Sequence, residues 1–223
     1  MIGLARSDKN DDGCGHSRSQ FQFVTHQSEP EEWGDEAGFH QNLRVGFLNI
    51  QSFPGKLDHD KNYNLIKLMH DYSLSCLGLA EANLYWPSLP IAQQMRERTN
   101  SWFEDVASMI TYNSRNTKVP RQPGGAAIIA KGPLVHRRKG GVLQWDPLGR
   151  WTTMSFHGRN GMCLHMTSAY RPQRKPEPYS PYQQHLQYLT SGGIDKDPLI
   201  VYDEDLCRLI KTYITAKDQV ILM

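Results

Sequence analysis

The fold of this chain is decided by two apolar segments, LRVGFLNI at residues 43–50 and LSCLGLAE at residues 74–81. Each has the length of a buried strand, and the polar residues Asn49 and Glu81 stand near their carboxyl ends. The segment NYNLIKLMH between them, at residues 62–70, favours a helix. A strand, a helix and a second strand predict a βαβ unit with two parallel strands. Neighbouring parallel strands have their carboxyl ends at the same edge of a sheet, so we expect Asn49 and Glu81 to lie close together. In open α/β sheets, ligands bind beyond this edge.

Alternating strand and helix patterns continue through the rest of the chain. Apolar runs predict further strands at residues 106–112, 126–130, 151–156, 162–168 and 219–223. Helices are predicted at residues 61–71, 91–98 and 182–189, and from Asp203 onwards. The dipeptide Asn160-Gly161 is typical of a tight turn and predicts a hairpin between two of these strands.

Several motifs stand in one order along the chain. After the segments ending in Asn49 and Glu81 come PGGAAIIA at residues 123–130, GRW at 149–151 and AYRP at 169–172. In this order they resemble the endonuclease/exonuclease/phosphatase domain, most of all its branch in non-LTR retrotransposons. The resemblance covers residues 43–223. It implies an α/β fold of DNase-like type, an incomplete four-layered α/β sandwich in which helices flank mixed sheets.

The resemblance also implies roles for three polar residues in phosphodiester cleavage. Glu81 would bind Mg²⁺ (or Mn²⁺), Asn49 would orient the metal ligand or contact the phosphate, and Tyr170 would place its hydroxyl near the phosphate. Mg²⁺ prefers carboxylate oxygens and keeps several waters, which suits a single Glu at a strand end. The chain departs from the family at two positions. Gln51 stands where repair-type members carry Asp, and Ala80 stands where Gln is common.

The residues alone leave simpler alternatives open for the same three side chains. A Glu after a strand is commonly a surface acid, and an Asn there commonly caps a turn. A Tyr at a strand end can pack without touching a ligand. His165, which shares a strand face with Cys163 and Thr167, is predicted to be a core or site-wall residue rather than a catalytic one.

The distribution of charge favours DNA as a partner. Residues 1–41 hold eight acidic and three basic residues, whereas the remainder holds 22 basic and 15 acidic ones. No acidic residue lies between Asp105 and Asp146. A basic body suits a polyanion, although such charge also serves solubility. The predicted nucleic-acid-binding residues are Arg121, Arg137 and Arg138 from this basic segment, with Asn83 and Arg171 nearer the predicted site.

Composition divides the chain into an acidic segment, residues 1–41, expected to be disordered or loosely ordered, and a domain at residues 42–223. No run approaches the ~18 apolar residues that span a bilayer, and no secretory signal is visible. An intracellular protein is expected, nuclear if it is a retroelement product, without a membrane partner or a small-molecule cofactor.

The resemblance implies one further feature at the end of the chain. In the family, the strand predicted at residues 219–223 leads into Gly-Asp-Phe-Asn, and a catalytic His follows later. Neither motif is present here, so the predicted domain lacks its C-terminal part. The expected function is the N-terminal portion of a Mg²⁺-dependent DNA endonuclease of retrotransposon type, with little or no activity alone. The alternatives are a non-catalytic nucleic-acid- or protein-binding remnant, or a phosphatase of the same superfamily.

Overall fold

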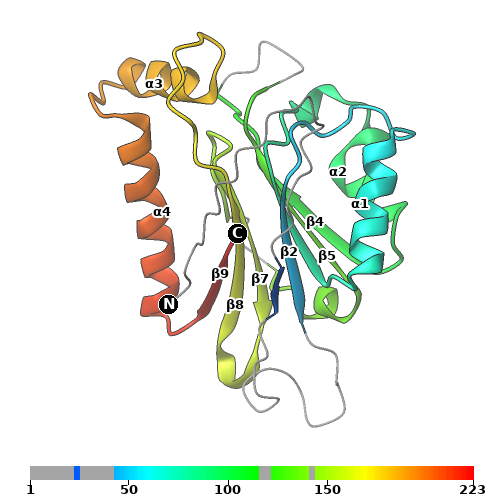
Figure 1. Cartoon of the computed structure of the whole chain (residues 1–223). Coiled ribbons are helices and arrows are strands. Elements are labelled where there is room, and N and C mark those ends of the chain that lie inside the picture. Colours follow the sequence, from blue (N-terminus) through cyan, green and yellow to red (C-terminus); the bar gives the residue numbers. More distant parts are fainter. Residues whose placement is uncertain (1–22, 26–42, 116–121, 141–143) are drawn as a thin grey trace, which may run out of the picture.

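The structure is a computed structural model that describes residues 23–25, 43–115, 122–140 and 144–223. Within these residues the strands form two sheets that pack face to face, and helices cover both outer faces (Figure 1). The order of layers is therefore helices, sheet, sheet, helix, which confirms the predicted α/β sandwich with mixed sheets. Among the described helices, none combines the length and apolarity that crossing a bilayer requires.

The first sheet has the strand order β1-β2-β3-β5-β4. Its strands are β1 (Phe23–Thr25), β2 (Arg44–Asn49), β3 (Cys76–Ala80), β4 (Val106–Ile110) and β5 (Ala126–Lys131). β2 and β3 run parallel, with Asn49 opposite Ala80, and α1 (Asp60–Asp71) connects them. The predicted βαβ unit is confirmed. The short β1, from the acidic segment, pairs antiparallel with β2, and the rest of that segment lies outside the described residues.

The second sheet has the strand order β6-β7-β8-β9. Its strands are β6 (Gln144–Trp145), β7 (Trp151–His157), β8 (Cys163–Ala169) and β9 (Gln219–Leu222). β7 and β8 form the predicted antiparallel hairpin, and Asn160 in its turn has a φ of 55° and a ψ of 31°. Such a left-handed conformation is one that Asn tolerates well. β8 and β9 are parallel, and α3 (Pro181–Ser191) and α4 (Pro198–Thr215) connect them.

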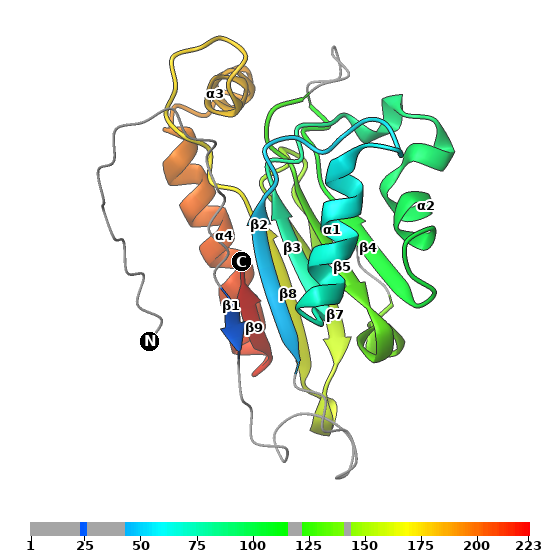
Figure 2. The ribbon, with the colours of Figure 1, turned by 45° about the vertical axis from the view of Figure 1, so that its right-hand side comes forward.

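Buried apolar clusters fill the space between the layers and hold them together. Leu65 and Met69 of α1 share one cluster with Leu77 and Leu79 of β3. A second cluster lies between the sheets, and its members include Cys76, Ile128, Met154, Phe156 and Met166. A third joins Trp151 of β7 to Tyr202 and Leu206 of α4. Figure 2 shows α1 and α2 together over the first sheet, with α4 on the far side against the second.

Two helix boundaries differ from the sequence prediction. The helix predicted at residues 91–98 is broken into the 3₁₀ helix Ile91–Gln93 and the α-helix α2 (Met95–Asn100), because Gln94 is extended (φ −70°, ψ 156°). The break leaves the Gln93 carbonyl free to accept a hydrogen bond from buried Arg98 at 2.9 Å. α4 begins five residues before the predicted start at Asp203, because Asp197 caps it by accepting from the Leu199 N–H and a proline follows the cap.

Candidate functional site

The carboxyl ends of β2 and β3 meet at one edge of the first sheet, the upper end in Figure 1. Asn49 is the last residue of β2 and lies opposite Ala80, so Glu81 follows one position beyond it. Neighbouring strands are ~4.8 Å apart and each residue advances ~3.3 Å, which places the two Cα atoms about 6 Å apart. The structure thus brings Asn49 and Glu81 together at this edge.

The backbone at this edge contains a concentration of left-handed residues that are not glycine. Gln51 and Ser52 follow β2 with φ of 49° and 88°, and Glu81 and Asn83 follow β3 with φ of 57° and 52°. The two turns hold each other, because the Ser52 N–H donates to the Glu81 carbonyl at 2.8 Å. Left-handed residues outside glycine cost of order 1–3 kcal/mol each and cluster at functional sites. This edge is therefore the strongest site candidate on backbone geometry.

Tyr170 reaches the same edge from the second sheet, one residue after β8. Its ring packs on Gly124, where an added Cβ would lie 3.4 Å from the ring Cε1 atom. Burial and, to a smaller extent, the negative charge of Glu81 raise the pKa of the Tyr170 hydroxyl to about 12. The hydroxyl is therefore protonated at neutral pH, near the Glu81 carboxylate, and able to donate a hydrogen bond.

Asn83 ties three loops together at the base of this edge. Its Nδ2 atom donates to Ser52 Oγ at 3.1 Å, and its Oδ1 atom accepts from the Gly124 N–H at 2.6 Å. The side chain thereby connects the ends of β2 and β3 to the loop before β5. In the structure, Asn83 therefore helps to shape the edge. The contact between Asn83 and nucleic acid remains a prediction.

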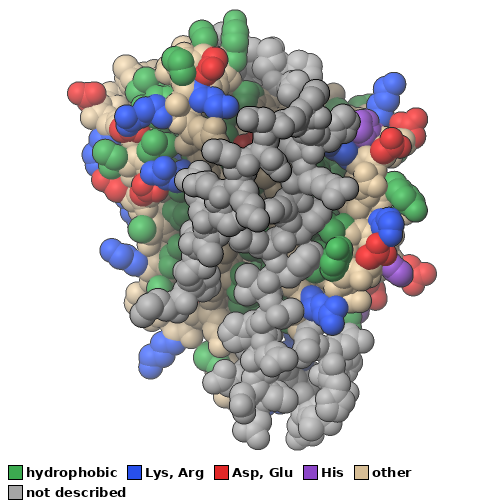
Figure 3. All heavy atoms as spheres, viewed as in Figure 1, with side chains coloured by type: hydrophobic (Ala, Val, Ile, Leu, Met, Phe, Trp, Pro, Cys, Tyr) green, Lys and Arg blue, Asp and Glu red, His purple; other side chains and the backbone are tan. Residues whose placement is uncertain are grey.

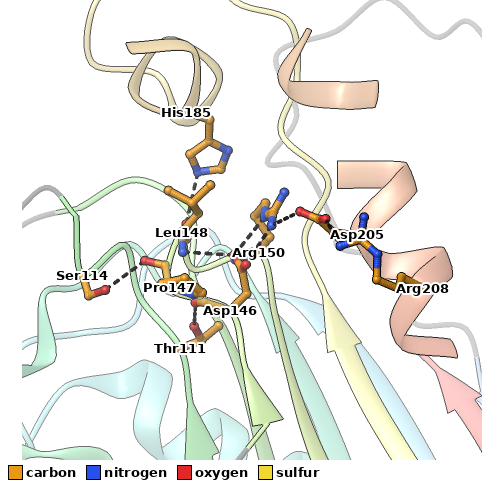
Figure 4. Close-up of polar contacts among 9 residues, drawn as sticks. All are labelled: Thr111, Ser114, Asp146, Pro147, Leu148, Arg150, His185, Asp205 and Arg208. Atoms are coloured by element: carbon orange, nitrogen blue, oxygen red, sulfur yellow. Dashed lines mark hydrogen bonds and ion pairs between the residues drawn. The ribbon is translucent and has the colours of Figure 1, made fainter. Parts of the chain in front are cut away.

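A buried ionic network supports the strand start beside Tyr170 (Figure 4). Arg150 donates through Nε and Nη2 to the two carboxylate oxygens of Asp146, at 2.9 and 2.8 Å, and through Nη2 to Asp205 at 2.8 Å. Burial lowers the pKa of Arg150, but the hydrogen bonds and charges of both carboxylates outweigh it and raise this pKa overall. The Arg150 carbonyl accepts the Tyr170 N–H at 2.7 Å, so this network positions Tyr170.

His185 of α3 joins the network from above, where its Nε2 atom donates to the Leu148 carbonyl at 3.1 Å (Figure 4). Burial and, to a smaller extent, the charge of Arg150 lower the pKa of His185 to about 4. Sequence reasoning missed this residue, since a histidine within a helix carries no signal of its partners.

We expect the buried His185 to make the protein acid-sensitive. An unfolded histidine takes up a proton near pH 6.5, whereas His185 in the folded protein does so only near pH 4. The unfolded state therefore binds more protons between these values, and stability falls as the pH falls. The contribution is about 3 kcal/mol between pH 7 and pH 4. Between pH 7 and pH 4, urea unfolding of His185→Gln should show a smaller loss of the free energy of unfolding than wild type does. Exposed His70→Gln should lose as much as wild type. Equal pH profiles for wild type and His185→Gln would contradict this.

Two of the predicted basic residues, Arg137 and Arg138, lie away from this edge. Arg137 and Arg138 follow β5 at its far end, beside Phe156 of β7, and one strand length of about 17 Å separates them from the Glu81 edge. They therefore cannot share one site with Glu81. Arg121 lies outside the described residues.

Arg171 does lie next to Tyr170, but it is paired on the protein itself. It donates through Nε and Nη2 to Asp203 of α4, at 3.0 and 2.8 Å, with both side chains about half exposed. Figure 3 shows blue and red side chains intermixed over the flank formed by α3 and α4. The described charge near Tyr170 is locally balanced on that flank.

His165 is buried in the second sheet. Its ring stacks on Tyr213 with centroids 3.7 Å apart, Nδ1 is 2.8 Å from Ser155 Oγ, and Nε2 is 2.9 Å from Asp218 Oδ2. Asp218 also accepts the Cys163 N–H. The group anchors α4 and β9 to the sheet, and the prediction of a core histidine is confirmed.

A divalent cation is compatible with the donors at this edge, although they are few. Within the described ranges, no three His, Cys, Asp or Glu side chains are grouped so that they could hold one metal ion. Mg²⁺ is commonly held by one or two carboxylates and several waters, and Glu81 supplies one carboxylate. Asn49 Oδ1 accepts the Gln51 N–H at 3.1 Å, so the donors that Asn49 could offer a phosphate are its amide N–H groups.

A cavity of about 340 Å³ opens beside β2 and α1. Asn49, Ile50 and Lys61 are among its lining residues, whereas Glu81 and Tyr170 are not. The cavity therefore borders the candidate site without containing it.

No family model and no curated protein matches this chain. Among solved structures, the AP endonuclease of Archaeoglobus fulgidus is 15% identical over 66% of this chain and 48% of its own, with a TM-score of 0.38. An AP endonuclease of Leishmania major is 14% identical over 75% and 48%, with a TM-score of 0.45. The human Nocturnin catalytic domain with bound sulfate is 16% identical over 79% and 66%, with a TM-score of 0.38. The chain spans about half the length of the two endonucleases.

Proposed function

We propose that this chain carries the metal- and phosphate-binding edge of a Mg²⁺-dependent phosphodiesterase that acts on DNA, of the retrotransposon-endonuclease type. The observation that supports this most is that Asn49, Glu81 and Tyr170, which stand at the ends of β2, β3 and β8, lie at one edge of the two packed sheets. A carboxylate and a hydroxyl suit the two sides of a phosphodiester reaction, because the carboxylate can bind the cation and the hydroxyl can donate to the phosphate oxygen.

In this proposal each residue has a separate task. Glu81 holds the cation, which neutralises charge on the phosphate and stabilises the leaving oxygen. Tyr170 donates its hydroxyl to a phosphate oxygen, and its pKa of about 12 keeps the proton in place at the pH of the cell. Asn49 donates an amide N–H to the phosphate. Metal binding is the primary measurement, because it reports on Glu81 directly.

Metal binding tests the role of Glu81. We expect Glu81→Gln to weaken Mn²⁺ binding, measured by electron paramagnetic resonance of the free ion, at least about tenfold, because the only carboxylate that we assign to the cation is lost. Tyr170→Phe should leave Mn²⁺ affinity within about twofold of wild type and lower nicking of supercoiled plasmid at least about tenfold. Glu97→Gln, which removes an exposed carboxylate on α2, is the matched control and should change neither. Equal Mn²⁺ affinity and equal nicking for wild type and Glu81→Gln would exclude the metal role.

A further inference from the structure

The ammonium group of Lys61 lies within hydrogen-bonding distance of three consecutive backbone carbonyls. Its Nζ atom is 3.0 Å from the oxygen of Ile50, 3.2 Å from that of Gln51 and 3.0 Å from that of Ser52. A lysine ammonium has three N–H donors, so all three are used here. Lys61 itself is in the first turn of α1, which fixes where its side chain starts.

The left-handed turn after β2 explains why three carbonyls face one cation. Gln51 and Ser52 both have positive φ, and in the turn that they form the carbonyls of Ile50, Gln51 and Ser52 all face Lys61 Nζ. Three converging carbonyl oxygens repel one another, and left-handed backbone is unfavourable outside glycine. Hydrogen bonds to a charged donor are stronger than those to a neutral one, so the Lys61 ammonium stabilises this turn.

The same two residues contact both members of the candidate metal edge. The Gln51 N–H donates to Asn49 Oδ1 at 3.1 Å, and the Ser52 N–H donates to the Glu81 carbonyl at 2.8 Å. A change in the 51–52 turn would therefore move Asn49 and Glu81 relative to each other.

We propose that Lys61 is a positioning residue for the cation site: its ammonium clamps the 51–52 turn and so sets the separation of Asn49 and Glu81. This inference rests on the proposed function. The clamp requires a compact ammonium, because the planar fork of arginine does not direct three N–H groups at converging carbonyls. Neither the sequence motifs nor the resemblance assigns Lys61 any role.

The structure also suggests how to restore the clamp after it is removed. Lys61 lines the cavity of about 340 Å³ beside β2, so its truncation would open the three carbonyls to that space. A small primary ammonium ion such as ethylammonium has three N–H donors and would fit there. Tetramethylammonium carries the same charge but no N–H donor, and it should have no effect.

The test is Mn²⁺ affinity of the full chain, followed by electron paramagnetic resonance. We expect Lys61→Ala to bind Mn²⁺ at least about tenfold more weakly, as residues that orient metal ligands typically do when mutated. Ethylammonium should restore the affinity of Lys61→Ala to within about twofold of wild type, whereas Lys61→Arg should remain weak. Lys67→Ala is the matched control, since Lys67 is on the same helix, lines the same cavity and pairs only with exposed Asp71 among the contacts described. It should keep wild-type affinity.

The failure of this inference can be told apart from the failure of the proposed function. Wild-type affinity in Lys61→Ala, with weakened binding in Glu81→Gln, would overturn the clamp and leave the metal edge standing. A wild-type chain that does not bind Mn²⁺ would overturn both. A Lys61→Ala protein that lost its fold would not recover with ethylammonium. Failure of ethylammonium and loss of a cooperative melting transition would together show a purely structural lysine and contradict the positioning role.

Discussion

Asp146→Ala is expected to lower the free energy of unfolding by about 3–5 kcal/mol, because it leaves the Arg150 charge buried and without its main partner. The side chains of Asp146 and Arg150 are 3% and 5% exposed. Asp146 Oδ2 also accepts the N–H groups of Leu148 and Arg150, at 3.1 and 3.0 Å, so the substitution removes the acceptor for this turn as well.

Urea denaturation of wild type and Asp146→Ala measures this loss. Asp203→Ala is the matched control, because Asp203 also forms a two-point contact with an arginine, Arg171, but at the surface. An exposed pair of this kind contributes about 0–1 kcal/mol. Removing both members of the buried pair, in Asp146→Ala with Arg150→Met, should destabilise less than the sum of the single changes. Equal losses for Asp146→Ala and Asp203→Ala would show that burial of the first pair has no energetic consequence.

The second large effect is expected at Arg98, which is fully buried on α2. Its guanidinium donates to the carbonyls of Pro54, Gly55 and Gln93, at 2.6, 3.1 and 2.9 Å. It also lies over the ring of Phe53, 5.1 Å from its centroid. Burial lowers the pKa of Arg98 to about 10, so it is charged at neutral pH. Arg98 thereby joins the loop after β2 to α2.

Arg98→Met is expected to lower the free energy of unfolding by at least about 3 kcal/mol. Methionine fills most of the space, but the carbonyls lose their donors, and each unsatisfied buried acceptor costs about 1–3 kcal/mol. The relief of burying one fewer charge offsets part of this cost.

Thermal and urea unfolding of Arg98→Met and Arg96→Met would measure the effect. Arg96 is exposed on the same helix, so its substitution should stay within about 0.5 kcal/mol of wild type. Equal stability of Arg98→Met and wild type would contradict this prediction. It would mean that the free-energy cost of burying the guanidinium equals the stabilisation that its hydrogen bonds contribute.

Local sequence patterns were sufficient for most elements of the fold. Apolar runs of strand length predicted β2, β3, β5 and the β7–β8 hairpin. A buried strand can be recognised from a few consecutive residues, because its buried positions are apolar in an alternating or continuous pattern. The βαβ order then placed Asn49 and Glu81 at one edge without further information. The pattern failed at Gln94, whose extended backbone breaks the predicted helix and leaves the Gln93 carbonyl to accept a hydrogen bond from Arg98.

The sequence by itself determined the layers of this protein and the pair of polar residues at the end of its first two strands. Only the tertiary structure decided that the Tyr170 ring packs on Gly124, that Lys61 holds three carbonyls, and that Arg137 and Arg138 lie at the opposite end of the sheet. The reason is physical. Strand and helix preferences act over a few neighbouring residues, whereas these contacts depend on the direction in which each strand runs and on the turns that follow it. Both are fixed only when the two sheets pack.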